Sequence, residues 1–220
     1  MEFINKNSLN YKMKLEKEIF LASHVSADGW LSKYIEKNCL QIVHGRRYYK
    51  NRMRYTIGYC NNNKVLIELF VRNMFDAFSL KPRYAKNKTQ VIFRSKRVYD
   101  QLKELGTGDS YNWFIHKSVY KRKRLMQIWL RSFYDDESTL NGKRVIVDSV
   151  NKNGLRQVSQ LLKKLKINHI FREYNFKYKG LIKKRYRITA YNLEQYYNLI
   201  GFNNTEKKSK ILKLLRKYRV

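Results

Sequence analysis

The chain has 220 residues, with 48 Lys and Arg against 17 Asp and Glu, so its formal net charge is +31. This length allows one large domain or two domains of roughly 100 residues each, and a content of 43% hydrophobic and 15% aromatic residues excludes a disordered basic tail. The excess of positive charge favours a polyanionic partner, nucleic acid first and an anionic membrane surface second.

The first half of the chain predicts the order helix–strand–strand–helix–strand–strand–helix. After a short solvated lead-in over residues 1–6, an amphipathic helix over 12–27 is ended by Asp28-Gly29. Strands over 40–43 and 55–59 are expected on either side of the basic segment 44–52. The remaining elements expected in this half are a helix over 64–79, strands over 83–86 and 90–94, and a helix over 96–105.

The same order recurs in the second half of the chain. A second long amphipathic helix over 121–136 ends at Asp135-Asp136-Glu137. A last basic helix over 206–218 carries an apolar stripe that we expect to dock on the second half, with its basic face in water. Between these helices, the pattern predicts a strand over 144–148, a helix over 151–165, strands over 171–178 and 184–189, and a helix over 191–200.

This recurrence predicts an internal duplication. The first half is expected over residues 1–108, a linker over 109–120, and the second half over 121–220. We therefore expect two related folding units on one chain.

The repeated feature that carries chemistry is the end of the long helix. Residues 21–29 and 130–138 align so that Asp28 matches Glu137, and a serine occupies the same helix position in both copies. Small residues let two helices approach closely, so both acids are expected side by side at the end of a helix pair. A lone acid at a helix end is usually only solvated, but its recurrence in both copies favours a site. Adjacent carboxylates suit a hard cation such as Mg²⁺ (or Mn²⁺), which can support phosphodiester hydrolysis.

These two segments resemble the signature motifs of single-chain LAGLIDADG homing endonucleases, and Trp129 to Glu137 is typical of archaeal members. The resemblance extends over residues 12–215 and includes the phrases at 111–115, 149–153 and 186–189. It implies an α+β fold of two pseudosymmetric αββαββα halves packed through the motif helices. Each half would present a curved antiparallel sheet to the DNA major groove.

The resemblance also implies the residues of a catalytic centre. Asp28 and Glu137 match the family's two metal-binding acids, and two lysines are candidates for positions near the scissile phosphates. The full implied set comprises Asp28, Glu137, Lys96 and Lys143 as catalytic residues, and Asp28, Glu137, Ala27 and Asp136 as metal ligands.

The match to the family pattern is imperfect at several positions. Ser26 stands where an acid is usual, and Ser138 stands where glycine is usual. His24 occupies an interface position that is normally aliphatic, and we expect it to be a packing residue rather than a ligand. The positions aligned with the family's water-ordering side chains hold Tyr59-Cys60 and Ser149-Val150, which lack the usual Gln or Asn paired with Lys.

Basic and aromatic side chains on the predicted strands form the expected DNA-binding surface. Arg and Lys bind guanine edges and Tyr packs on sugars or methyl groups, although exposed strands also carry generic charge. The predicted contact residues are Arg46, Arg47, Tyr48, Tyr49, Lys50, Arg52, Arg54, Arg83, Lys86, Lys88, Arg94, Arg144, Arg172, Lys177, Lys179, Lys183, Lys184, Arg185 and Arg187.

These observations predict a monomeric, sequence-specific endonuclease that cuts a long, near-asymmetric double-stranded DNA target. Two alternatives remain open: a LAGLIDADG DNA-binding regulator that has lost cleavage, and a maturase that binds its host intron RNA. No apolar stretch approaches the roughly 18 residues of a membrane span, and no signal peptide is recognised. Cys39 and Cys60 form no CxxC pair, so we expect an intracellular, reducing location without a structural zinc site.

Overall fold

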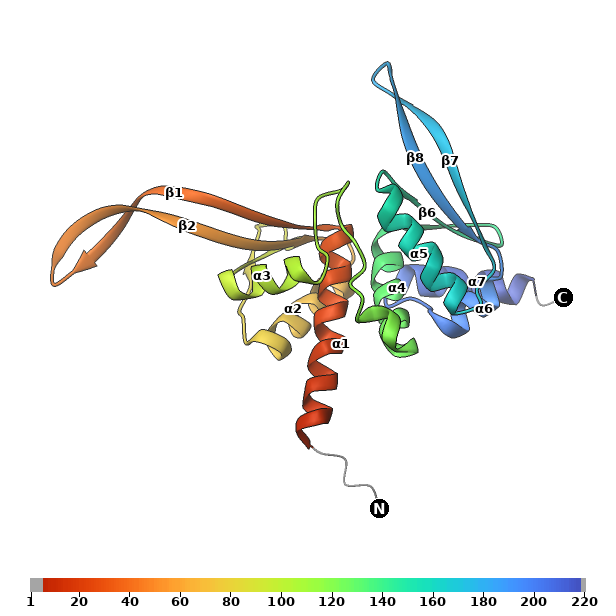
Figure 1. Cartoon of the computed structure of the whole chain (residues 1–220), viewed down its shortest axis with the longest axis horizontal. Coiled ribbons are helices and arrows are strands. Elements are labelled where there is room, and N and C mark those ends of the chain that lie inside the picture. Colours follow the sequence, from red (N-terminus) through yellow and green to blue (C-terminus); the bar gives the residue numbers. More distant parts are fainter. Residues whose placement is uncertain (1–5, 219–220) are drawn as a thin grey trace.

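The computed structural model describes residues 6–218, and its side chains over 10–177 and 179–218. Most of the predicted lead-in, residues 1–5, lies outside the described residues, and its last residue, Lys6, begins the first helix. Two halves with the same order of elements each contain a four-stranded antiparallel sheet (Figure 1). None of the helices within residues 6–218 is long and apolar enough to cross a membrane.

The first half follows the predicted order from helix to helix. Its sheet has the strand order β1-β2-β4-β3, and Asn63 and Ser95 cap α2 and α3 by accepting main-chain hydrogen bonds. The elements are α1 (Lys6–Ala27), β1 (Gly29–Val43), β2 (Arg46–Cys60), α2 (Lys64–Phe78), β3 (Arg83–Tyr84), β4 (Gln90–Arg94) and α3 (Lys96–Glu104).

The prediction that the basic segment 44–52 separates two short strands is wrong, because most of this segment belongs to β2. Only His44 and Gly45 form a turn, with φ values of 49° and 77°, as a two-residue hairpin requires. Arg46 onward continues as β2, paired with β1 apart from an irregularity between Glu36 and Cys39. The result is a ribbon that projects far beyond the helices (Figure 1). Its outer part has no buried face, so apolar alternation could not reveal it.

The second half repeats the same order and adds a C-terminal helix. Its sheet has the order β5-β6-β8-β7, and its long hairpin is β7–β8 rather than the first pair of strands. The elements are a 3₁₀ turn η1 (Val119–Lys121), α4 (Lys123–Glu137), β5 (Ser138–Asn141), β6 (Arg144–Ser149), α5 (Lys152–Lys164), β7 (His169–Tyr178), β8 (Leu181–Ala190), α6 (Leu193–Leu199) and α7 (Thr205–Lys217).

Each half has its own apolar core, and the two cores meet where α1 packs on α4. The segment between the halves is also packed: Trp113 is buried and its ring centroid lies 5.0 Å from that of Phe133. The long hairpins rise on opposite sides of this central helix pair (Figure 1). The ends of α1 and α4 therefore lie between the two sheets.

Candidate active site and DNA-binding surface

The C-terminal parts of α1 and α4 approach each other closely. Ser23 is fully buried, and its hydroxyl donates a hydrogen bond of 2.7 Å to the carbonyl of Trp129. Ser132, at the matching position of α4, is also fully buried. These small side chains permit the close helix contact that the sequence predicts.

Both motif acids lie at the point where a motif helix passes into its first strand. Glu137 is the last residue of α4, and Asp28 separates α1 from β1. Burial, together with repulsion from Asp28 and then Asp136, raises the pKa of Glu137 to about 7. Partial burial of its carboxylate and the nearby Asp136 raise the pKa of Asp28 to about 6. The Asp28 carboxylate is thus close enough to Glu137 to contribute to the rise in its pKa.

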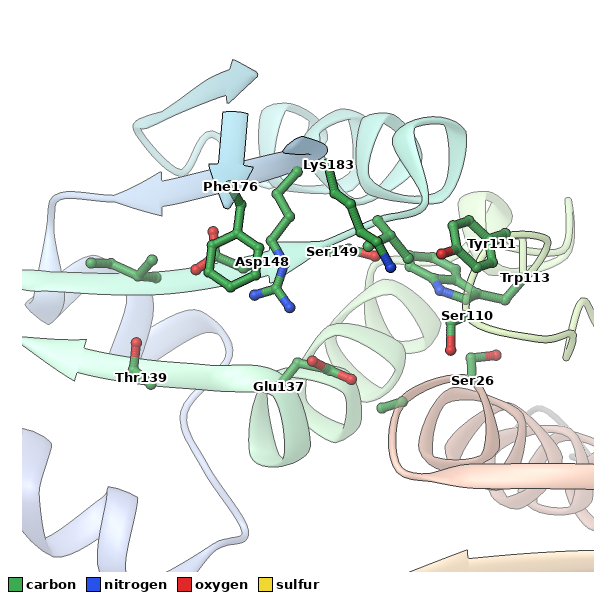
Figure 2. A pocket seen from close by; sticks show the side chains of 14 residues that line it. Ser26, Ser110, Tyr111, Trp113, Glu137, Thr139, Asp148, Ser149, Phe176 and Lys183 are labelled. Atoms are coloured by element: carbon green, nitrogen blue, oxygen red, sulfur yellow. The ribbon is translucent and has the colours of Figure 1, made fainter. Parts of the chain in front are cut away.

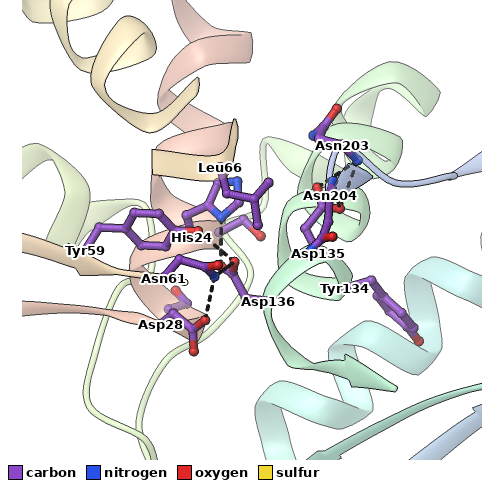
Figure 3. Close-up of polar contacts among 12 residues, drawn as sticks. His24, Asp28, Tyr59, Asn61, Leu66, Tyr134, Asp135, Asp136, Asn203 and Asn204 are labelled. Atoms are coloured by element: carbon purple, nitrogen blue, oxygen red, sulfur yellow. Dashed lines mark hydrogen bonds and ion pairs between the residues drawn. The ribbon is translucent and has the colours of Figure 1, made fainter. Parts of the chain in front are cut away.

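Asp136 is the centre of a polar network between the two halves. His24 Nδ1 lies 2.7 Å from Asp136 Oδ2, and neither side chain is exposed. The Tyr59 hydroxyl donates to Asp136 Oδ1 at 2.8 Å, and Asn61 Nδ2 donates to the same oxygen at 3.0 Å (Figure 3). Both carboxylate oxygens of Asp136 are therefore engaged by protein groups.

Asn61 joins this network to the first motif acid. Its Nδ2 also donates to Asp28 Oδ2 at 3.0 Å (Figure 3), so one amide group orients Asp28 against Asp136. The sequence alignment placed Tyr59-Cys60 at the water-ordering position of the first half. The side chain that contacts Asp28 is instead that of the next residue, Asn61. Asn61 was missed because its Asn-rich surroundings indicated only a turn and a helix cap.

His24 is a buried member of this network, with aromatic neighbours. Its ring centroid lies 4.4 Å from that of Phe20 and 5.2 Å from that of Tyr59. Burial alone would lower the pKa of His24, but the Asp136 carboxylate more than offsets this, and the pKa is raised. His24 thus packs in the interface and also neutralises Asp136.

Lys207, near the start of α7, reaches the end of the second motif helix. Its Nζ donates to the carbonyls of Asp135, Tyr134 and Asp136 at 2.7, 3.1 and 3.2 Å. These carbonyls belong to the last turn of α4, where helix geometry leaves carbonyls without an intrahelical partner, although that of Tyr134 also accepts from the Ser138 amide. The expectation that the basic face of the C-terminal helix stays in water is therefore wrong for Lys207, although it holds for exposed Lys208.

Asp135 anchors the segment that leads to α7. Its carboxylate is buried and accepts main-chain hydrogen bonds from Asn203 and Asn204, each at 2.9 Å. Asn204 in turn caps α7 by accepting from the amides of Glu206 and Lys207. This chain of contacts fixes the start of α7 against the end of α4.

The two lysines predicted near the scissile phosphates lie beside tyrosine rings. Lys96 lies over the ring of Tyr55, and Lys143 lies 4.5 Å from the ring centroid of Tyr218. Within the described residues, neither lysine forms an ion pair with either motif acid. Lys96 begins α3, and Lys143 lies in the turn between β5 and β6.

Glu137 opens into a pocket between the second sheet and the linker. Figure 2 shows Glu137 with Ser26 and Ser110 nearby and Lys183 across the pocket. Its lining also includes Ala27, Tyr111, Asp148, Ser149, Val150 and Arg185. The predicted metal ligand Ala27 therefore shares a pocket with Glu137, as do Ser149 and Val150, which align with the family's water-ordering side chains. Arg185 faces this acid closely enough to oppose the rise in its pKa.

Strand alternation divides the predicted contact residues of β2 between two faces. Side chains of successive strand residues point to opposite faces, and Ile57 and Tyr59 mark the face that packs on the first core. Arg47 and Tyr49 share that face of the ribbon. The open face carries Arg46, Tyr48, Lys50, Arg52 and Arg54.

The second sheet has a similar division, and some of its cations are paired. Arg185 and Lys183 lie on the open face with Arg187, whereas Lys184 points to the other face. Arg187 donates two hydrogen bonds to Asp148, at 2.7 and 2.8 Å, and Lys184 pairs with Glu173 at 3.1 Å. These paired side chains are less available to DNA than the prediction assumed.

The remaining predicted contact residues lie at various places on the two sheets. In the first half, Arg83 and Arg94 share the open face, and Lys86 and Lys88 lie in the connection between β3 and β4. In the second half, Arg144 lies over the Tyr191 ring, Arg172 pairs with Arg187 in the strand register, and Lys177 and Lys179 lie near the tip of β7–β8.

Comparison with protein-family models gives no match, and comparison with curated proteins gives none either. Among solved structures, mesophilic variants of the homing endonuclease I-DmoI match with a TM-score of 0.64 and 18% identity, covering 86% of this chain and 96% of theirs. I-DmoI in complex with DNA and Ca also matches with a TM-score of 0.64, at 15% identity, covering 91% of this chain and 98% of that chain. Full-length DUF199/WhiA from Thermatoga maritima matches with a TM-score of 0.54 and 11% identity, over 93% of this chain and 62% of that chain.

The chain therefore has the LAGLIDADG fold, with two α+β halves arranged as in the endonuclease I-DmoI. I-DmoI has been solved with DNA and Mn, and a variant of it with its target DNA in the presence of Mg. The predicted fold class is confirmed. The comparisons give no support to an intron RNA partner.

Proposed function

We propose that this protein is a sequence-specific DNA endonuclease of the single-chain, archaeal-type LAGLIDADG homing class. It would hydrolyse phosphodiesters in both strands of a long, near-asymmetric target with a divalent metal ion held by Asp28 and Glu137. The observation that carries this proposal is the pairing of these two acids at adjoining helix ends, between two sheets of the I-DmoI type.

The donor set fits a hard divalent cation. Asp28 and Glu137 supply carboxylate oxygens, and their mutual repulsion is relieved when a cation binds between or beside them. No group of three or more His, Cys, Asp or Glu side chains within residues 10–177 and 179–218 is arranged to hold a metal alone. Water and DNA phosphate oxygens would complete the ligand set, which suits an ion that acts only on bound substrate. When bound, Mg²⁺ or Mn²⁺ lowers the pKa of water and stabilises charge on the phosphate.

The protein's own groups would orient the acids and the DNA. Asn61 holds the Asp28 carboxylate, while Arg185 and Lys183 line the Glu137 pocket, where a phosphate would approach. The open faces of the two sheets would lie in the major groove, with Arg and Lys contacting base edges and phosphates. Because both halves lie on one chain, a monomer would suffice, and the target need not be palindromic.

One observation favours a second candidate, a DNA-binding regulator without cleavage. Both oxygens of the predicted ligand Asp136 are already engaged by His24, Tyr59 and Asn61. This protein would then bind the same kind of target without cutting it.

A target selection with a cleavage readout separates the two candidates. A plasmid library with randomised inserts is incubated with the protein in Mg²⁺ and, separately, in Mn²⁺, and both linearised and merely bound plasmids are sequenced. The endonuclease proposal predicts one family of inserts in both fractions. The same inserts bound but uncut with either ion would support the regulator.

A further inference from the structure

Lys207 occupies a place that the two-fold repeat does not explain. It belongs to α7, which follows the second copy, and its Nζ lies within 3.2 Å of three carbonyls at the end of α4. A lysine held by three main-chain oxygens has little freedom to move. Its positive charge is therefore a fixed part of the acid cluster rather than a solvated charge.

The charge of Lys207 acts mainly on one side of the acid pair. Lys207 lines the same small pocket as Asp28, Asn61 and Asp136, whereas Glu137 opens into the pocket against the second sheet. The cations of that second pocket, Lys183 and Arg185, are borne on a strand and at least partly exposed. Lys207, by contrast, is held by three main-chain carbonyls.

Lys207 also donates a hydrogen bond to a main-chain carbonyl that corresponds to a metal ligand implied by the resemblance. Of the predicted ligands, Ala27 can offer only its carbonyl, and the equivalent group in the other half is the carbonyl of Asp136. That carbonyl accepts a hydrogen bond from Lys207 Nζ at 3.2 Å. An ammonium at this position competes with a divalent cation for the same oxygen and repels it.

We propose that Lys207 is a positioning residue that makes the two acids unequal, so that Asp28 holds a divalent cation less tightly than Glu137 does. This inference rests on the proposed function, because it takes Asp28 and Glu137 as metal ligands. The lysine fixes the end of α4 and partly neutralises the Asp28 side. Lys207 opposes the rise in the pKa of both acids, and its attraction to Asp28 is larger than its attraction to Glu137.

The test measures cation affinity on each side of the pair separately. Asp28→Asn leaves the Glu137 side, and Glu137→Gln leaves the Asp28 side. Lys207→Gln is added to each, and Lys208→Gln is the matched control, since it removes the same charge from an exposed neighbour. Binding of Tb³⁺ is followed by tyrosine-sensitised luminescence, with Mn²⁺ as competitor, and circular dichroism confirms that each variant is folded.

The proposal predicts that Lys207→Gln tightens ion binding about tenfold in the Glu137→Gln protein, as expected for removing one close charge at an intermediate dielectric. It predicts a smaller change in the Asp28→Asn protein, and none from Lys208→Gln. Lys207→Arg, which keeps the charge, should behave like the parent. If Lys207→Gln lowers only the melting temperature, Lys207 is merely a helix cap and this inference is overturned. If the Asp28→Asn/Glu137→Gln protein binds ions as well as the wild type, the proposed function fails with it.

Discussion

His24 and Asp136 form a buried ion pair across the junction of the two halves, with Nδ1 and Oδ2 2.7 Å apart and both side chains inaccessible to solvent. Each residue comes from a different motif helix. The pair therefore ties the helices together directly at the level of the acids. A charge buried at such a position requires its partner.

Replacing His24 with leucine is the first test of this relationship. His24→Leu should lower the free energy of unfolding by about 3–5 kcal/mol, because Asp136 is left buried without its counter-charge. The double variant His24→Leu/Asp136→Ala should lose less than the sum of the single changes. Urea denaturation of the four proteins measures this coupling, and strictly additive losses would contradict it.

The pH dependence of stability follows from the raised pKa of Glu137. The pKa of Glu137 is about 7 in the folded protein against an ordinary value of 4.5, so the folded protein binds the proton more tightly than the unfolded chain. The stabilisation is complete below pH 4.5 and is lost as pH rises through 7. In EDTA, Glu137→Gln should therefore be more stable than the wild type at pH 8, by on the order of 2 kcal/mol.

Thermal melts between pH 4 and pH 8 measure this difference. At pH 4 the two proteins should be about equally stable, and added Mg²⁺ should stabilise the wild type more than Glu137→Gln at pH 8. A constant difference across this range would contradict the assignment of the raised pKa to Glu137.

The alternation of side chains on the β1–β2 ribbon predicts which of its cations read DNA. Arg46→Ala and Lys50→Ala remove open-face contacts, and each should weaken target binding by about 1–3 kcal/mol. Arg47→Ala removes the same charge from the opposite face and should change affinity by less than about threefold. Fluorescence anisotropy at one salt concentration gives the comparison, and equal losses for all three would show that the faces are assigned wrongly.

The packing of the linker predicts the effect of a single added methyl group. Gly106 has φ of +102°, and a Cβ there would lie 2.0 Å from the carbonyl oxygen of Phe114. Gly106→Ala should destabilise the protein by about 2–4 kcal/mol. Gly142→Ala is the control, because φ is also positive (+54°) but the space is open, and it should cost about 1 kcal/mol. Similar melting temperatures for the two variants would contradict a tightly packed linker.

The periodicity of apolar residues correctly predicted those helices and strands that have a buried face. The long helices, the buried strands and the pairing of Asp28 with Glu137 follow from periodicity and from the recurrence of one helix end. The outer ribbon around Arg46 lacks such a face, so its strands were predicted too short.

Contacts made by tertiary packing were beyond the sequence pattern. Lys207 resembles the other lysines of its helix, and only the return of α7 to the end of α4 distinguishes it. Asn61 lies one position beyond the residues expected to order water. Lys96 and Lys143 were candidates for positions near the scissile phosphates by the family resemblance, which could not predict their contacts with the rings of Tyr55 and Tyr218.

The most direct test of the proposed function is strand cleavage of the selected target by the wild type, Asp28→Asn and Glu137→Gln proteins. With saturating protein and Mg²⁺, the wild type should cut both strands. Each variant should bind the target within about threefold of the wild-type affinity, while cleavage falls at least about a hundredfold, since each acid supplies metal ligation worth several kcal/mol. Cleavage of the target at the wild-type rate by both variants would contradict the account.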